Sequence, residues 1–337
     1  MNTRRVSIKD IAAEAGSSIA LVSFVMNNRA SGQNKYRVNK DTARRILEVA
    51  DRLGYQPNNA ARALRCGKTN TIGVIVSDIS NKFFADIARC IEDRAHQRNY
   101  TVLFGSTDEN TDKLDNLINV FQNKGIDGLI IAPSENSEES IKRVSALQIP
   151  MVLLDRELPG VETNSVLLDN LKGGAQITEA LLARGCRHIE MISYSMRLSN
   201  IIDRETGFKL CMEKAGLASE GMIYRIRHDR FDTISQVIID AKERGVEGLL
   251  FATNSLALSG LRVISRNGWK IPEDFAVATF DGNDAFEINN LEIAYIQQPI
   301  AQFGTEAVDL LLKNVELKTG TLSPTRIILS PKLILNG

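Results

Sequence analysis

Little in the 337-residue sequence marks a secreted, metal-binding or membrane protein. The four cysteines, Cys66, Cys90, Cys186 and Cys211, lie far apart and form no CxxC pair, so neither a disulfide framework nor a zinc site is indicated. No apolar run reaches the roughly 18 residues that a membrane-spanning helix needs, and the opening Met-Asn-Thr-Arg-Arg has no apolar stretch behind its charges. We therefore expect a soluble, cytoplasmic protein with reduced thiols.

Features of an enzyme are also scarce. The three histidines, His96, His188 and His228, have no nucleophile motif or metal-ligand spacing near them. The Gly67-Lys68-Thr69 segment lacks the upstream glycine of a phosphate-binding loop. These absences argue against catalysis, and we expect neither a cofactor nor a metal ion.

Charge is abundant but unevenly distributed. Up to Lys68 the chain has thirteen Lys and Arg against five Asp and Glu, a net charge of +8, so residues 69–337 carry −8 while the whole chain sums to zero. A localised positive segment suits phosphate neutralisation on DNA. Charge alone leaves open the alternative of a small helical domain with a solvated basic face.

Two short helices are predicted within that basic segment. Ser7, with Asp10 three residues later, has the pattern of a capped helix start, and apolar residues follow at helical spacing. Gly16 breaks this helix, and Ser18 can cap a second one. The inward face of the second helix holds Val22, Val25 and Met26, and its outward face holds Ile19, Ala20, Ser23, Phe24 and Asn27. Two helices joined by a glycine-containing turn are typical of a helix-turn-helix.

From Thr71 onward, short apolar runs alternate with longer amphipathic segments. The alternation indicates buried parallel strands connected by helices, in two successive series. In the first series we expect strands near 72–76, 101–104, 128–132 and 151–154, with helices near 83–98, 111–124 and 138–147. In the second we expect strands near 189–193, 222–226, 248–252 and 275–279, with helices near 171–184, 203–215, 231–244 and 255–267. Two doubly wound subdomains follow, each with a crevice at the carboxyl ends of its strands.

Residues 6–73, which end in Leu64-Arg-Cys-Gly-Lys-Thr-Asn-Thr-Ile-Gly73, resemble the headpiece and hinge of the lactose-repressor (LacI/GalR) family of bacterial transcription regulators. Similar strings continue along the chain: Ser77-Asp-Ile-Ser-Asn-Lys-Phe-Phe84, Leu154-Asp-Arg156, Leu168-Asp-Asn170, Arg204-Glu-Thr-Gly-Phe208, Phe280-Asp281 and Gln298-Pro299. Each string is short, but their order and spacing together are specific.

The resemblance implies an all-α helix-turn-helix headpiece at residues 1–56, a hinge helix and linker at 57–70, and an effector-binding and dimerisation core at 71–337. The core is expected to be α/β and periplasmic-binding-protein-like, with two doubly wound parallel-sheet subdomains and three crossovers between them. The implied boundaries place residues 71–165 and 299–322 in the first subdomain, and 166–298 and 323–337 in the second. A last helix near 300–317 would return to the first subdomain.

Side chains at or just after predicted strand ends are carried over as effector ligands. Phe83 and Phe84 would form an apolar wall, whereas Phe231 is placed only loosely and has core packing as its alternative. The implied polar groups are Asp155, Arg204, Asn254, Asp281 and Gln298. An arginine fork and two carboxylates suit pairs of hydroxyl groups, which favours a sugar or sugar derivative. A surface ion pair for Arg204, and loop capping for Asp155 and Asp281, are the alternatives.

The headpiece departs from the family pattern at its DNA-reading surface. Many members have a polar or basic residue where Phe24 stands and a threonine where Leu21 stands. The expected base-contacting residues are Ser18, Ile19, Ala20, Ser23, Phe24 and Asn27. Apolar members of this set would contact thymine methyl groups, although Phe24 could instead pack on the long loop 29–37.

Contacts with the DNA backbone and the minor groove are expected from other residues. Phosphate contacts are expected from Arg4, Arg5, Lys9, Lys35, Arg37 and Arg44. In a hinge helix at 57–64, the minor-groove residues would be Asn58, Arg62, Ala63 and Leu64. Leu64 would wedge a base step and kink the duplex.

These observations predict a homodimeric transcription regulator, with a repressor favoured, that a small-molecule effector controls. Two headpieces would read the half-sites of a pseudo-palindromic DNA operator, and cleft closure would alter the hinge spacing. The segment Ser330-Pro-Lys-Leu-Ile-Leu-Asn-Gly337 suits a final strand and leaves no room for a tetramerising heptad helix. The alternative is a non-enzymatic sugar-binding protein of transport type, against which the basic segment and the missing signal peptide argue.

Overall fold

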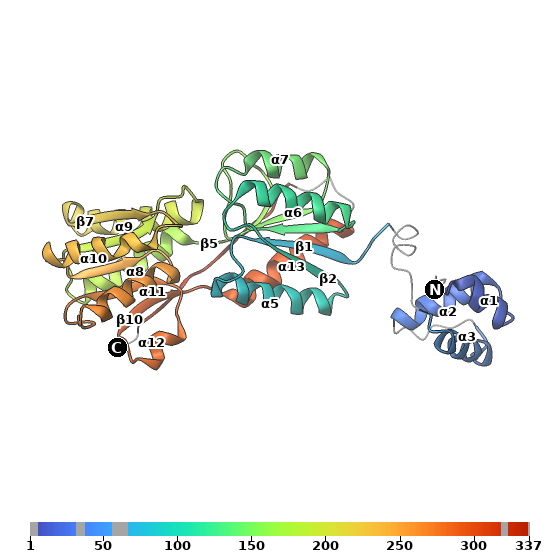
Figure 1. The fold of residues 1–337 in the computed structure, drawn as a ribbon. Helices are drawn as coiled ribbons and strands as arrows, with labels where there is room; N and C mark the ends of the chain where they lie inside the picture. The colour runs from blue at the N-terminus through green and yellow to red at the C-terminus, as the bar shows by residue number, and fades with distance from the viewer. Residues whose placement is uncertain (1–5, 32–37, 56–66, 318–322, 336–337) are drawn as a thin grey trace. The chain divides into compact units, whose positions relative to one another are not determined.

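The computed structural model describes residues 6–31, 38–55, 67–317 and 323–335. The chain divides into two compact units, Met1–Gly67 and Lys68–Gly337. Figure 1 shows the helical unit in blue and the larger α/β unit in cyan to red. None of the described helices is a candidate for crossing a membrane, because none combines sufficient length with an apolar composition.

The described residues of the first unit form three helices: α1 (Ile8–Glu14), α2 (Ile19–Ser31) and α3 (Lys40–Arg52). The capped start of α1 is confirmed, since the backbone N–H of Ser7 donates to Asp10 Oδ2 at 2.8 Å. Gly16 follows α1 with a left-handed φ of +56°, which ends the helix. Ser18 Oγ accepts from the backbone N–H of Leu21 at the start of α2. The helices pack around fully buried Ile11, Val22, Val25 and Ile46. The predicted helix-turn-helix is confirmed.

The first sheet of the second unit is entirely parallel, in the order β11-β5-β4-β3-β1-β2. Its strands are β1 (Thr71–Val76), β2 (Thr101–Ser106), β3 (Gly128–Ile131), β4 (Met151–Leu154), β5 (Asn164–Leu168) and β11 (Arg326–Leu329). One face packs against α6 (Thr111–Asn123) and α7 (Glu138–Ala146), and the other against α5 (Lys82–Gln97) and α13 (Ile300–Glu316). We call this sheet and its helices the first lobe.

The second sheet has the order β12-β10-β9-β8-β6-β7, in which β12 runs antiparallel to β10 and the other neighbours are parallel. Its strands are β6 (Ile189–Tyr194), β7 (Gly221–Ile226), β8 (Gly248–Phe251), β9 (Ala276–Phe280), β10 (Ile293–Gln297) and β12 (Lys332–Ile334). Its helices are α8 (Asn170–Ala183), α9 (Ser199–Lys214), α10 (Ile234–Glu243), α11 (Asn254–Arg266) and α12 (Asp284–Ile288). Two short 3-10 turns, η1 (Ala218–Glu220) and η2 (Phe231–Thr233), flank β7. This sheet and its helices form the second lobe.

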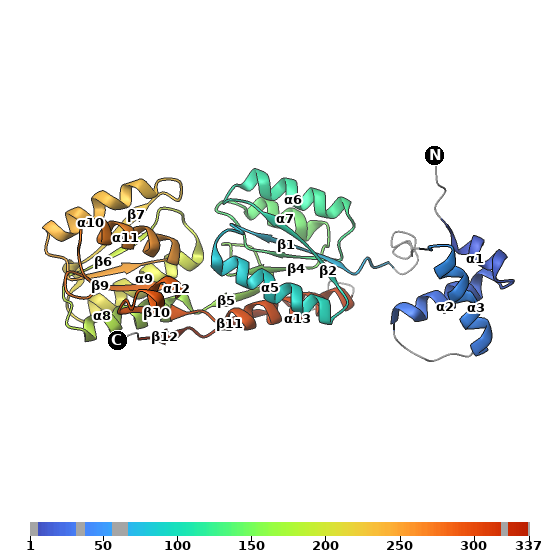
Figure 2. The same cartoon turned by 60° about the horizontal axis from the view of Figure 1, so that its bottom comes forward.

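The chain passes between the lobes after β5, after β10 and after β11. The expected return of the last helix is confirmed, because α13 packs against α5, β3, β4 and β5 (Figure 2). Sheet membership differs from the implied boundaries, which gave residues 166–168 and 326–329 to the second subdomain. Both segments are strands of the first sheet, β5 and β11. A buried apolar strand has the same pattern in either sheet, so the sequence pattern cannot assign it to one of them.

Candidate functional site

A cleft of about 630 Å³ opens at the carboxyl ends of strands from both lobes. Parallel strands end at one edge of their sheet, so the loops after β1, β4, β6, β8 and β9 all reach this cleft. The structure brings together along it all eight residues predicted for effector binding: Phe83, Phe84, Asp155, Arg204, Phe231, Asn254, Asp281 and Gln298.

Asp155 and Asp281 occupy matching positions in the two lobes. Asp155 follows β4 and Asp281 follows β9, with left-handed φ values of 65° and 64°. Each backbone N–H donates at 2.9 Å to the next strand of its sheet, at the carbonyl of Val166 or Ile296. Non-glycine residues rarely adopt this backbone conformation, and such residues concentrate at functional sites. The fold therefore presents one carboxylate from each lobe to the same cleft.

Asp155 is buried and only partly satisfied. Its Oδ2 accepts a hydrogen bond from Asn200 Nδ2 at 2.8 Å and lies 3.4 Å from Arg156 Nε. Its Oδ1 is buried with no hydrogen-bond partner among the described residues. Burial raises the pKa of Asp155, although Arg156 and Arg204 oppose that effect. A ligand hydroxyl that donates to Oδ1 would remove the cost of this unmade bond.

Asp281 pairs with an amide and not with a cation. Gln298 Nε2 donates to its Oδ1 at 3.0 Å and to its Oδ2 at 3.1 Å. Burial raises the pKa of Asp281 to about 6, while Arg204 and Gln298 act in the opposite direction. Gln298 Oε1 is itself buried without a hydrogen-bond partner in the part of the chain that the structure describes. The Asp281 carboxylate and the Gln298 amide oxygen can therefore each accept a hydrogen bond from a ligand.

Arg204 is buried on α9 and is not a surface residue. Its Nε donates to Asn170 Oδ1 at 2.8 Å, its Nη1 donates to the carbonyl of Ala252 at 2.7 Å, and its guanidinium lies 4.0 Å from the ring centre of Phe280. Burial lowers the pKa of Arg204, while Asp155 and Asp281 oppose that shift. The two bonds orient the guanidinium, and Nη2 makes no such bond with the described residues and can donate to a ligand.

A close approach of α9 to α8 places Arg204 beside Asn170. A Cβ built on Gly207 would lie 2.2 Å from the carbonyl oxygen of Leu171, and one on Gly174 would lie 2.4 Å from that of Arg204. Backbone atoms cannot yield to such contacts, so glycine is required at both positions. The Arg204-Glu-Thr-Gly-Phe208 string therefore joins a cleft-lining arginine to the glycine that lets its helix pack.

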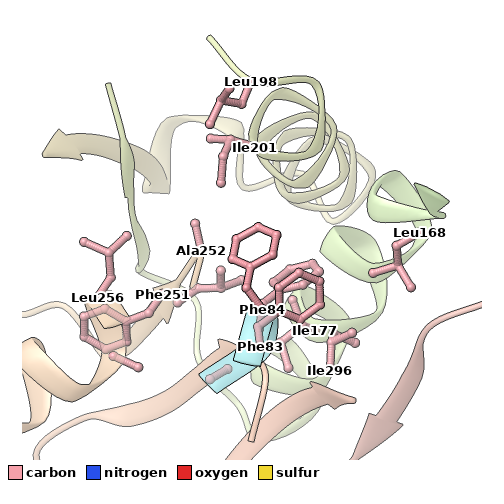
Figure 3. Close-up of a cluster of buried hydrophobic side chains, with 14 of the residues drawn as sticks. Phe83, Phe84, Leu168, Ile177, Leu198, Ile201, Phe251, Ala252, Leu256 and Ile296 are labelled. Carbon is pink, nitrogen blue, oxygen red and sulfur yellow. The ribbon is translucent and has the colours of Figure 1, made fainter. Parts of the chain in front are cut away.

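Aromatic side chains form the apolar part of the cleft. Phe83 and Phe84, at the start of α5, are nearly buried and meet edge to face at 4.9 Å. Figure 3 shows them among buried side chains that include Leu198 and Ile201 near the start of α9. Phe231 lies in η2 and meets Tyr194 edge to face at 6.1 Å. Asn254 is the buried first residue of α11.

The polar residues of the cleft that were not among the predicted ligands include Arg156, Glu109 and Asn200. Arg156 and Glu109 form an ion pair of 2.8 Å with side chains only 8% and 11% exposed, and Asn200 bonds to Asp155. Arg156 belongs to the Leu154-Asp-Arg156 string, so the strand-end rule could have included it. Glu109 and Asn200 had no comparable signal, because their hydrogen-bond partners, Arg156 and Asp155, lie 47 and 45 positions away in sequence.

The predicted DNA-reading face of α2 is accessible. Ile19 and Phe24 are 51% and 43% exposed, Ser18 and Ala20 are also exposed, and Ser23 is half-buried. Lys9 is exposed, whereas Arg44 lies between Asp41 at 3.4 Å and Glu48 at 3.9 Å. The Asn27 side chain lies outside the described residues. The same holds for Arg4, Arg5, Lys35, Arg37, Asn58, Arg62, Ala63 and Leu64.

Two family models match the chain. Residues 7–58 match "Bacterial regulatory proteins, lacI family", and residues 69–334 match "Periplasmic binding proteins and sugar binding domain of LacI family". The transcriptional regulator RegA of Clostridium saccharobutylicum is 30% identical over 93% of each chain. Catabolite control protein A of Streptococcus mutans is 33% identical over 93% of this chain and 92% of its own. A lac repressor dimer bound to operator superposes with a TM-score of 0.85 at 20% identity, covering 99% of each chain.

Proposed function

Because the chain belongs to the LacI family of bacterial regulatory proteins, we propose that it is a cytoplasmic repressor that binds operator DNA as a homodimer and responds to a sugar effector. The matched family is one of DNA-binding transcription regulators, so the chain is a regulator and not an enzyme. Its helix-turn-helix unit supplies DNA binding, and its cleft supplies the response to a small molecule.

The observation that carries the effector proposal is the set of unsatisfied buried oxygens in the cleft. Asp155 Oδ1 and Gln298 Oε1 are buried acceptors without partners among the described residues, and both residues line a cavity large enough for a sugar. Sugar hydroxyl groups donate and accept at once, so neighbouring hydroxyls could bond to a carboxylate and to Arg204 Nη2 together. The aromatic rings of Phe84 and Phe231 would cover the apolar face of the ring.

A response requires that the cleft influence the rest of the chain. Among the described residues, three hydrogen bonds join the two lobes: Asn200 Nδ2 to Asp155 within the cleft, the backbone N–H of Glu157 to Ser199 Oγ, and the backbone N–H of Arg197 to Glu135 Oε1. An effector bound between the lobes would strengthen or replace these bonds. Its free energy of binding would differ between lobe arrangements, which is the requirement for allosteric control.

The DNA side of the proposal depends on α2. Ile19, Ala20 and Phe24 present an apolar, exposed face that cannot make the bidentate bonds by which longer polar side chains read guanine or adenine. We propose that this face contacts thymine methyl groups, and that Lys9 contacts phosphate. Arg44 is a weaker candidate, because two carboxylates already neutralise it.

The homodimer follows from the operator. A two-fold arrangement gives each headpiece one half-site of a pseudo-palindrome. Light scattering should then return about twice the 37.2 kDa chain mass. A stable monomer at the concentrations that saturate an operator would contradict the proposal.

A thermal-shift screen against unphosphorylated sugars tests the effector directly. A ligand at about 100 times its dissociation constant adds roughly 2.7 kcal/mol to the folded state, a readily measured shift. The expected result is at least one sugar that stabilises the parent and not an Arg204→Ala variant. A sugar-binding protein of transport type would pass this test but show no operator binding in a gel-shift assay, which separates the two functions.

A further inference from the structure

We propose that Glu109 sets the charge of the effector: by occupying the guanidinium of Arg156, it makes the cleft accept an uncharged sugar and reject a phosphorylated one. The inference rests on the proposed function and specifies the chemical class that the same cleft takes.

Glu109 is held in an unusual backbone conformation in which its side chain meets Arg156. Asp108 and Glu109 are consecutive residues with left-handed φ values of 52° and 58°, in the connection between β2 and α6. Two such residues in succession are uncommon outside glycine, and the surrounding structure must maintain them. Glu109 Oε1 lies 2.8 Å from Arg156 Nη2, and Glu109 Oε2 accepts from Nη1 at 2.9 Å. The contact is the two-bond fork geometry by which arginine also binds phosphate.

Other groups also surround the Arg156 guanidinium, although its buried Nε has no hydrogen-bond partner among the described residues. Nη1 donates to the carbonyl of Pro133 at 3.2 Å, Nη2 lies 3.5 Å from Ser77 Oγ, and Nε lies 3.4 Å from Asp155 Oδ2. Two carboxylates therefore surround one buried guanidinium, and Glu109 occupies the Nη1–Nη2 edge that would bind a phosphate group. The parent cleft offers Arg156 as a neutralised group and not as an anion receptor.

Arg204 does not restore a positive cleft. It donates to the neutral Asn170 and Ala252 and lies in the field of Asp155 and Asp281. Among the described lining residues the buried cations are Arg156 and Arg204, against the carboxylates of Glu109, Asp155 and Asp281. Arg262 and His228 also line the cleft but are exposed, so solvent screens them. A phosphate would therefore add a further anion to a cleft in which these three carboxylates already outnumber the two buried guanidinium groups.

The test compares matched sugar pairs by calorimetry: ribose with ribose 5-phosphate, and glucose with glucose 6-phosphate. For a pair in which either member binds, the parent should bind the unphosphorylated sugar at least tenfold more tightly. Glu109→Gln keeps the side-chain size but frees Arg156, and should narrow that ratio at least fivefold. Asp108→Asn is the matched control, because Asp108 pairs with exposed Lys113 and not with Arg156. It should leave the ratio within twofold of the parent.

A double variant, Glu109→Gln with Arg156→Gln, covers the case in which the single variant does not fold. It removes both charges and leaves no buried arginine unpaired, so it should retain the parent's preference. Three results would overturn the inference. The parent could bind a phosphorylated sugar as tightly as the unphosphorylated one, or more tightly. Folded Glu109→Gln could keep the parent's ratio of the two affinities, or the double variant could gain affinity for the phosphorylated sugar. A phosphorylated sugar that binds the parent at least as tightly as its unphosphorylated counterpart and alters operator affinity overturns only this inference. Binding of neither kind of sugar would instead contradict the proposed function.

Discussion

The side-chain amide of Asn200 donates a hydrogen bond of 2.8 Å to Asp155 Oδ2, and this bond crosses the cleft. Asn200 lies on α9 of the second lobe, whereas Asp155 follows β4 of the first. Both residues are at least 95% buried, so the bond forms in a setting of low polarity where an unmade bond is costly. The lobes are therefore connected through the same carboxylate that we propose as an effector ligand.

Replacing Asn200 should show how much its hydrogen bond to Asp155 contributes to the free energy of unfolding. In Asn200→Ala, Asp155 loses its hydrogen-bond donor while staying buried, and the free energy of unfolding should fall by about 1–3 kcal/mol. Urea denaturation measures the change. Ile202→Ala, at a 41% exposed position on the same helix, should stay within about 0.5 kcal/mol of the parent. Equal stability of Asn200→Ala and the parent would show that the bond across the cleft contributes nothing.

Asp281 should make stability depend on pH in a defined direction. Its pKa is raised by burial from 3.8 to about 6, so between these values the folded chain holds a proton that the unfolded chain releases. The contribution of Asp281 to stability is therefore greatest below about pH 4 and is lost as the pH rises through 6. Relative to Asp281→Asn, the parent should gain on the order of 3 kcal/mol between pH 7 and pH 4, at about 1.4 kcal/mol per pKa unit.

Asp274 provides the control for that titration. Its pKa is lowered, chiefly by the hydrogen bond from Lys242, so its contribution should be lost on acidification. Chemical denaturation of the parent, Asp281→Asn and Asp274→Asn between pH 4 and pH 7 separates the contributions of the two carboxyl groups. A parent that gains nothing over Asp281→Asn on acidification would rule out the raised pKa.

Arg204→Ala should separate effector binding from DNA binding. Loss of a buried charged donor typically costs about 2–5 kcal/mol, which raises the effector's dissociation constant more than tenfold. Operator affinity without effector should stay within about threefold of the parent, since the helix-turn-helix is a separate unit. Calorimetry and a gel-shift titration measure the two affinities, and a thermal melt confirms folding. Arg262→Ala, at an exposed lining position, should change effector affinity little. An equally strong effect there would remove the special role of Arg204.

The two described phosphate candidates should behave differently on DNA. Each lost phosphate contact reduces the slope of log affinity against log salt by about 0.9. Lys9→Ala should show this full reduction. Arg44→Ala should show less, because Asp41 and Glu48 lie within 4 Å of the Arg44 guanidinium. Fluorescence anisotropy on one operator over a salt series measures both slopes. Parallel lines for the parent and Lys9→Ala would place Lys9 away from the phosphates.

Local patterns determined how much of the molecule could be predicted from the sequence. Asp155 and Asp281 were predictable because each directly follows an apolar strand, and parallel strands end at one edge. The strand-to-sheet assignment of β5 and β11 was not, because pairing joins Arg326 to Ser165 across 161 residues and leaves no local trace. Glu109 was equally hidden, since its importance lies in a partner, Arg156, that only the tertiary structure brings within reach. Contacts between residues far apart in the sequence were therefore the part of the structure that the sequence could not predict.

The most direct test of the account is operator affinity with and without the sugar that the thermal-shift screen identifies. The parent's affinity should change at least fivefold on saturation with that sugar, within the usual range of allosteric coupling of about 1–3 kcal/mol. The Arg204→Ala variant should bind the operator and show no change at the same concentration. An operator affinity in the parent that is identical with and without the bound sugar would contradict the account, because ligand binding in the cleft would then be uncoupled from DNA binding.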